Sequence, residues 1–221
     1  MHTSGIQKHP SASQVAPEVI AALRGIAVAL LSDQLQRNSG SVGLTPYHKP
    51  APLVGTAVTV RTRGGDNLAI LRAFEFCRPG DVIVIDAEGN TANAVVGGIL
   101  SSYAASIGTA GMVIDGAIRD VDEIRARTYP VYARGVNHRG PYKDGPGAIN
   151  VPVTVGGMVV NPGDIVVGDQ DGLLAFAPAL AASTIEQARS QAAKEEATMT
   201  AMREGKWDKS FIDALEARCM N

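Results

Sequence analysis

The residues that could do chemistry stand at the two ends of the segment from Gly97 to Asp120. Gly97 and Gly98 precede a run of small residues with a helical pattern, and Arg119 and Asp120 follow an apolar strand pattern. The first N–H groups of a helix have no backbone partner and can bind an anion, and glycines let a ligand approach the main chain. If the strand runs beside the helix start, the guanidinium can grip a carboxylate and the acid can hold a divalent metal ion.

Each half of this predicted site also has a purely structural explanation. Arg119 and Asp120 could be a surface ion pair at a helix start, and the glycine pair could allow a helix to pack closely on a sheet. The functional interpretation gains weight because strand-end loops gather sites in sheets that are flanked by helices. Glu123 lies three residues on, on the same helical face as Asp120. A second carboxylate that reaches a metal through water suits magnesium, which keeps much of its hydration shell.

The composition excludes several classes of partner. A net charge of -2 and a pI near 6.1 give no bulk electrostatic attraction for nucleic acid or an anionic membrane. No apolar run approaches the roughly 20 residues that a membrane span needs. The two cysteines lie far apart without CxxC spacing, so neither a disulfide framework nor a zinc site is indicated. We therefore expect a cytoplasmic protein that binds neither nucleic acid nor a membrane.

Motifs of competing enzyme classes are missing from the sequence. There is no GxGxxG after the first predicted strand and no GxxxxGK[ST], so neither a dinucleotide site nor a P-loop is indicated. Ser101 and Ser102 lack the G-x-S-x-G context of a serine hydrolase. No glycine-rich strand-to-helix turn suited to S-adenosylmethionine stands out, which disfavours a methyltransferase.

The order of the patterns predicts one domain of the α/β class. The middle of the chain alternates strands and helices, and no linker separates a second core. We predict a flexible N-terminal extension over residues 1–16, a catalytic domain over 17–178 and a C-terminal helical extension over 179–221. The first helical run, residues 17–37, is expected to break at Gly25. The long C-terminal helix has a narrow apolar stripe, so it should project from the core and pack on a neighbouring subunit.

The central stretch resembles the RraA-like family. The resemblance is carried by GGILSSYAASIGTAGMVIDGAIRD, with DAEGN upstream and INVPVTVGGMVVNPGDIVVGDQDG downstream, and it covers roughly residues 19–178. The family includes class II 4-hydroxy-4-methyl-2-oxoglutarate aldolases, which also decarboxylate oxaloacetate, and regulators of ribonuclease activity. The resemblance implies a swivelling three-layer α/β/α sandwich, assembled as a homotrimer or a dimer of trimers.

The resemblance also implies roles for individual residues. Arg119 would contact a 2-oxo acid, and Asp120 would bind Mg²⁺ or Mn²⁺. In related aldolases a C-terminal glutamate of an adjoining subunit assists, and Glu195 or Glu196 is the nearest candidate here. The residues whose main-chain N–H groups would bind the substrate carboxylate are Gly97, Gly98, Ile99 and Leu100.

The activity that the resemblance implies is cleavage of a carbon–carbon bond. A short 2-oxo dicarboxylic acid would yield pyruvate, by retro-aldol cleavage or by decarboxylation of oxaloacetate, through a pyruvate enolate. The chain departs from the family aldolases at Gly98, where they commonly carry an acid, and in the loop of residues 135–147. A non-catalytic regulator that binds a ribonuclease or another protein is the alternative. It predicts an incomplete metal site, whereas Arg119, Asp120 and Glu123 are all present.

Overall fold

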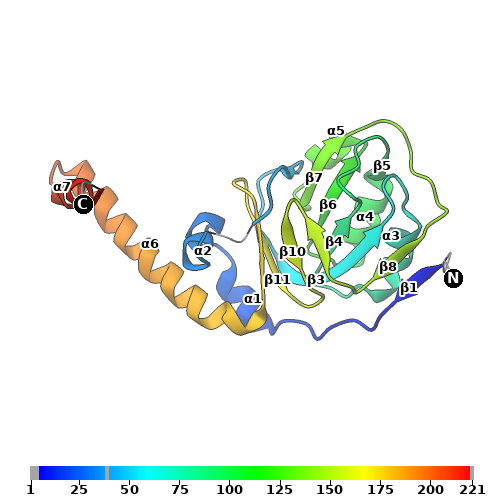
Figure 1. The fold of residues 1–221 in the computed structure, drawn as a ribbon, viewed down its shortest axis with the longest axis horizontal. Coiled ribbons are helices and arrows are strands. Elements are labelled where there is room, and N and C mark those ends of the chain that lie inside the picture. The colour runs from blue at the N-terminus through cyan, green and yellow to red at the C-terminus, as the bar shows by residue number, and fades with distance from the viewer. Residues whose placement is uncertain (1–4, 38–39, 220–221) are drawn as a thin grey trace.

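A ten-stranded sheet forms the centre of the described chain, residues 5–37 and 40–219 of this computed structural model (Figure 1). Parallel pairing of β3 with β4, β4 with β6 and β6 with β7 builds its middle, and β11–β12 and β5 attach at β3 and β6. This arrangement confirms the α/β class. The strands are β1 Ile6–Lys8, β2 Thr45–Pro46, β3 Leu53–Thr62, β4 Asp81–Asp86, β5 Ala94–Val96, β6 Gly111–Ile118, β7 Val131–Val136, β8 Gly147–Ile149, β9 Val153–Val155, β10 Met158–Val160, β11 Ile165–Gly168 and β12 Leu173–Phe176.

Helices connect the parallel strands and extend the C-terminal end. Gly25, with a φ of 83°, separates α1 from α2, which is the break predicted for the first helical run. None of the helices in residues 5–37 and 40–219 combines the length and the apolar composition needed to cross a bilayer. The helices are α1 Pro17–Leu23, α2 Val28–Gln34, α3 Leu68–Ala73, α4 Gly98–Ser106, α5 Val121–Arg125, α6 Ala181–Arg203 and α7 Ser210–Cys219.

The apolar core lies on both faces of the sheet. Side chains of β4 alternate between the faces, because successive residues of a strand point in opposite directions. Ile83 and Ile85 join a cluster with α3 and α4, whereas Val82 and Val84 face the hairpin β9–β10. A third cluster packs α1, α2 and the start of α6 on β11 and β12. Helices thus cover one face, and the hairpin and the remaining helices cover the other.

Residues 5–16 lie against the sheet rather than forming the flexible extension that the sequence predicted. β1 pairs in parallel with β8, at the edge of the sheet. Farther along, Arg78 donates to the carbonyl of Ala12 at 2.9 Å, and the amide of Val15 donates to Thr56 Oγ1 at 3.0 Å. The polar composition of this segment misled the prediction, because backbone groups can pair with a sheet edge whatever the side chains are. Residues 1–4 lie outside the described part.

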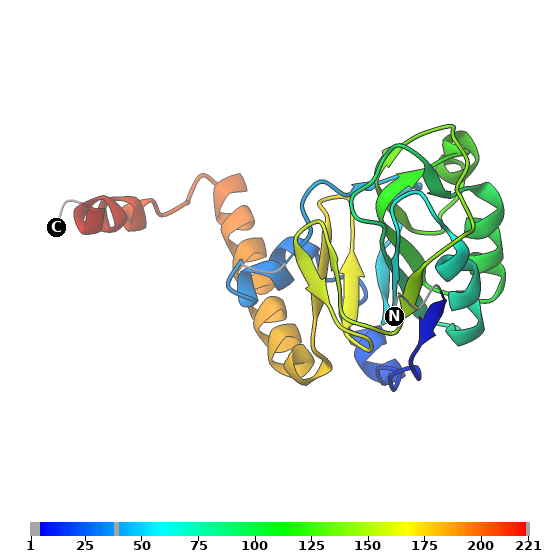
Figure 2. The same ribbon diagram turned by 45° about the vertical axis from the view of Figure 1, so that its right-hand side comes forward.

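The C-terminal extension leaves the core as a long helix, as predicted. The first turns of α6 are anchored by Ala181, Ile185 and Ala188, which are buried in the cluster with α1 and α2. Beyond residue 188 the helix extends away from the sheet, and α7 lies farther out still (Figures 1 and 2). Its contact with a neighbouring subunit stays a prediction. Large apolar side chains exposed along this extension are Met199, Met202, Trp207, Phe211, Ile212 and Leu215.

Gly111 tests how tightly the strand that leads to Arg119 is packed. A Cβ atom at this position would lie 2.6 Å from Leu53 Cδ1 and 2.8 Å from the carbonyl oxygen of Pro130. We expect Gly111→Ala to lower the free energy of unfolding by about 1–3 kcal/mol, because overpacking forces the neighbours apart. Urea denaturation measures the change. The control is Gly5→Ala, which has open space around it, and equal stability of the two variants would contradict the packing argument.

Candidate active site

The two ends of the Gly97–Asp120 segment meet because β5, α4 and β6 form a strand–helix–strand unit. β5 pairs in parallel with the far end of β6, with Ala94 opposite Ala117 and Val96 opposite Ile118. β5 therefore ends at Val96 beside the point where β6 ends at Ile118, and Gly97 and Arg119 follow these neighbouring strand ends. The amide of Arg119 donates to the carbonyl of Val96 at 3.0 Å, which ties the two strand ends together.

Asp120 contacts the start of α4 directly. The amide of Gly98 donates to Asp120 Oδ2 at 2.9 Å. Asp120 has a left-handed backbone, with φ 60° and ψ 39°, where the chain turns from β6 into α5. Arg119 Nε lies 3.8 Å from Asp120 Oδ2, and the two side chains are 42% and 45% exposed. An ion pair this long and this exposed stabilises the fold little. A structural ion pair at a helix start therefore does not by itself account for the arrangement of Arg119 and Asp120.

The glycine pair leaves room for carboxylates rather than for a sheet. A Cβ atom on Gly97 would lie 2.6 Å from Asp120 Oδ2, and one on Gly98 would overlap the carboxylate of Glu123. Only a residue without a side chain allows both acids to come this close to the main chain. Close packing of the helix on the sheet does not explain the glycine pair, because the nearest atoms belong to the side chains of Asp120, Arg119 and Glu123.

Glu123 is held over the first turn of α4 by Arg127. The guanidinium of Arg127 forms an ion pair with Glu123 Oε1 and also donates to Ser102 Oγ. Ser102 in turn donates to the carbonyl oxygen of Gly98. The carboxylate of Glu123 is thus positioned from two helices, next to the amide that binds Asp120.

A cavity of about 160 Å³ opens between these groups. Of the predicted residues, Gly97, Ile99, Leu100, Arg119 and Asp120 line this cavity. Gly98 and Glu123 are not among its lining residues, and they contact each other beside it. The wall also contains residues that the sequence did not single out. These are Asn67, Leu71, Ala94, Val95, Val96, Pro141 and Lys143.

Two other places in the described chain contain a cavity or a buried charge. A larger cavity of about 390 Å³ lies between α1, α2 and β11, but its lining is mostly apolar, with Asp169 as the charged residue. Within β6, Asp115 forms an ion pair with Arg134, and its hydrogen bond raises the pKa of that guanidinium. Asp115 also accepts from the amide of Gly156 at 2.7 Å, so this pair ties the hairpin to the sheet. Asp169 accepts from the amide of Val28 at 2.9 Å, so its own carboxylate already occupies the start of α2.

The predicted metal ligand Asp120 is suited to a hydrated cation. No group of three or more His, Cys, Asp or Glu side chains within residues 5–37 and 40–219 could enclose a metal ion. Asp120 uses Oδ2 for the Gly98 amide, which leaves Oδ1 available at the cavity. Magnesium and manganese accept one or two carboxylates and take their remaining ligands from water and substrate oxygens. The donor set therefore fits such an ion with a chelating substrate.

Glu195 and Glu196 are not brought to the cavity within one chain. Both lie on the projecting part of α6, where Glu195 accepts from Gln191 at 3.0 Å and Glu196 pairs with Arg203 at 2.8 Å. α6 lies on the far side of the sheet from α4 and α5 (Figure 1). A role for either glutamate requires a second subunit and stays a prediction.

Comparison with known proteins agrees with the family indicated by the sequence. A family model described as RraA-like, Aldolase/RraA, matches residues 28–175. A protein of Halalkalibacterium halodurans described as "putative 4-hydroxy-4-methyl-2-oxoglutarate aldolase" is 39% identical over 189 residues, which is 84% of this chain and 89% of that protein.

Solved structures share the fold over most of the chain. An uncharacterized protein from Pseudomonas syringae is 28% identical, with a TM-score of 0.79, over 87% of this chain and 92% of that one. The RNA-processing inhibitor RraA from Thermus thermophilis is 30% identical, with a TM-score of 0.63, over 69% and 92%.

Proposed function

Because the chain belongs to the RraA-like family, we propose that it is a divalent-metal-dependent lyase that releases pyruvate from a short 2-oxo dicarboxylic acid. The substrate is a 4-hydroxy-2-oxo acid, cleaved by a retro-aldol reaction, or oxaloacetate, which loses carbon dioxide. The observation that carries the proposal is the convergence of the α4 start, Arg119 and Asp120 on one cavity. The name of the Halalkalibacterium protein supports an aldolase.

The α4 start would hold the carboxylate of the pyruvate half. The amide of Gly98 already donates to Asp120, and the amide of Ser101 donates to the carbonyl of Gly97. The N–H groups of Ile99 and Leu100 therefore remain to bind an anion, at the positive end of the helix. Both residues line the cavity.

Arg119 would stabilise the charge that develops on the 2-oxo oxygen. When the C3–C4 bond breaks, its electron pair moves into an enolate, and a fixed cation beside that oxygen lowers the barrier. A divalent ion bound by Asp120 would supply further Lewis-acid stabilisation of the same charge. Asp120 and Glu123 would orient the water that takes the proton of the 4-hydroxyl group and returns a proton to the enolate carbon.

The assembly is part of this proposal. A homotrimer, or a dimer of trimers, would allow Glu195 or Glu196 of one subunit to approach the cavity of another. The exposed apolar side chains of α6 and α7 are consistent with such a contact. Light scattering on the purified protein measures the assembly directly.

The metal dependence is tested by a coupled assay of pyruvate release. Oxaloacetate and 4-hydroxy-4-methyl-2-oxoglutarate serve as substrates, with enzyme-free samples as controls for spontaneous decarboxylation by free metal. We expect chelation to reduce turnover by about 100-fold or more, in line with the loss of one strong electrostatic stabiliser, and added Mg²⁺ or Mn²⁺ to restore it. Undiminished turnover in the chelator would contradict the metal role.

A non-catalytic regulator is the second candidate function, and the name of the Thermus structure favours it. In that case the surface, rather than the cavity, would carry the function by binding a ribonuclease or another protein. The regulator is supported if neither substrate gives pyruvate while the protein inhibits and binds a purified ribonuclease. Metal-dependent release of pyruvate would instead support the lyase and argue against a non-catalytic regulator.

A further inference from the structure

The loop of residues 137–146 forms a wall of the cavity and touches Arg119. The carbonyl of Arg139 accepts from the amide of Ala94 at 2.8 Å, and that of Gly140 accepts from Asn93 Nδ2 at 2.7 Å. A Cβ atom on Gly140 would lie 3.0 Å from Arg119 Nη1. The loop is therefore fixed against β5, and it lies close to the guanidinium of Arg119, which lines the cavity.

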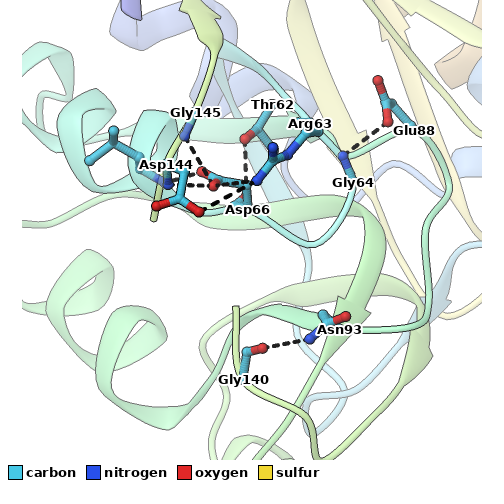
Figure 3. A network of polar contacts seen from close by, with 10 residues as sticks. Thr62, Arg63, Gly64, Asp66, Glu88, Asn93, Gly140, Asp144 and Gly145 are labelled. Carbon is cyan, nitrogen blue, oxygen red and sulfur yellow. Dashed lines mark hydrogen bonds and ion pairs between the residues drawn. The ribbon is translucent and has the colours of Figure 1, made fainter. Parts of the chain in front are cut away.

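The buried carboxylate of Asp66 anchors the other end of this loop (Figure 3). Its Oδ2 accepts from the amides of Asp144 at 2.6 Å and Gly145 at 3.0 Å. Its Oδ1 accepts from the amide of Leu68 at 2.9 Å, at the start of α3. One fully buried side chain thus fixes the loop to α3, directly after Lys143.

Lys143 brings a second cation to the cavity. It lines the wall next to Pro141, and among the described residues no carboxylate lies within ion-pair distance of its ammonium group. The charged side chains that line the cavity are thus two cations, Arg119 and Lys143, and one anion, Asp120. Asn67 also lines this wall, where its Nδ2 donates to the carbonyl of Val95 and its buried Oδ1 has no hydrogen-bond partner.

We propose that Lys143, presented by the loop that Asp66 anchors, binds the second carboxylate of the substrate and selects dicarboxylates over monocarboxylates. The inference rests on the proposed function for the orientation of the ligand, with the 2-oxo acid end at α4 and Arg119. A cation without a partner in a small cavity favours an anion there, and a charged hydrogen bond is among the stronger polar contacts. Asp66 is a positioning residue, since it acts on the ligand through the loop.

Binding of two matched ligands tests the role of Lys143. 2-Oxoglutarate and 2-oxopentanoate have the same carbon chain, and only the first carries a second carboxylate. Calorimetry in the presence of Mg²⁺ should show that Lys143→Met weakens 2-oxoglutarate binding by about 10- to 100-fold, the range for a charged hydrogen bond. Binding of 2-oxopentanoate should stay nearly unchanged. The control is Lys8→Met, on an exposed edge strand away from the cavity.

Asp66→Asn tests the anchor in the same assay. The substitution removes the charge that holds the amides of Asp144 and Gly145, so 2-oxoglutarate should bind several-fold more weakly, by the loss of hydrogen bonds to a charged group. Affinity for 2-oxopentanoate should change little. Asp144→Asn is the matched control for the lost charge, because the exposed side chain of Asp144 shares Arg63 with Asp66 but accepts from neither loop amide.

The outcomes separate this inference from the proposed function. If Lys143→Met weakens the binding of both ligands equally, or of neither, Lys143 does not form a subsite for the second carboxylate. If Asp66→Asn weakens the binding of both ligands equally and also lowers the melting temperature, Asp66 is a structural residue without a positioning role. If the wild-type protein binds 2-oxoglutarate selectively through Lys143 but releases no pyruvate, the subsite stands and the lyase does not.

Discussion

Replacing Arg119 by alanine should lower kcat/KM for pyruvate release by about 100-fold or more, comparable to the loss of one oxyanion donor in other enzymes. The guanidinium lies at the end of β6, lines the cavity and has only a 3.8 Å contact with Asp120 to neutralise it. Its charge is therefore free to act on a substrate. Because the side chain is partly exposed, the substitution should leave the free energy of unfolding nearly unchanged.

Two further variants show whether the effect depends on geometry or on charge alone. Arg119→Lys keeps the charge but loses the planar fork, so it should recover only part of the activity. Arg125→Ala removes a cation that stacks on Tyr47 instead of lining the cavity, and it should retain near wild-type turnover. If Arg119→Ala and Arg125→Ala reduce kcat/KM equally, Arg119 has no special place in the reaction.

The meeting of the two segments could be predicted because it follows from the order of elements. An apolar strand after a helix with a glycine-rich start indicates a parallel strand–helix–strand unit, whose strand ends share one edge of the sheet. The structure has this unit in β5, α4 and β6. The three residues of β5 could not be predicted, because so short a strand has no periodicity and exists only through its pairing with the far end of β6.

The second wall of the cavity also depends on contacts between distant parts of the chain. Lys143 and Asn67 are 76 positions apart, by their numbers, and nothing in either local sequence indicates that they face one cavity. Asp66 stands two residues before α3, where an acid is typical of a helix start, and it accepts from the amide of Leu68. Its second role, holding the amides of Asp144 and Gly145, required the fold to be known.

At Gly98 the chain lacks the acid of the family aldolases, and a carboxylate from another part of the chain lies beside this position. The family aldolases that the chain resembles commonly carry an acid at this position, so the sequence lacks a carboxylate on residue 98 itself. The structure places the carboxylate of Glu123, held by Arg127, where a Cβ atom of residue 98 would stand. An acid is therefore present beside the α4 start, although it comes from α5.

Asp120→Asn is expected to weaken Mg²⁺ binding about 10- to 100-fold or more and to lower pyruvate release at least as much, since a neutral amide oxygen attracts a divalent cation less strongly than a carboxylate does. Asparagine is the informative replacement. Residue 120 has a φ of 60°, and asparagine adopts this left-handed conformation nearly as readily as aspartate, whereas alanine would add backbone strain. The amide oxygen of asparagine can still accept from Gly98, so the loop should keep its shape.

The measurement is calorimetric titration with Mg²⁺ or Mn²⁺, followed by turnover at saturating metal. Asp122→Asn is the control, because it removes an exposed acid two residues away without touching the cavity. Partial recovery of Asp120→Asn at high metal concentration would place the defect in metal binding. If its metal affinity equals that of the wild type, Asp120 is not the ligand, and the hydrogen bond to Gly98 is then its structural purpose.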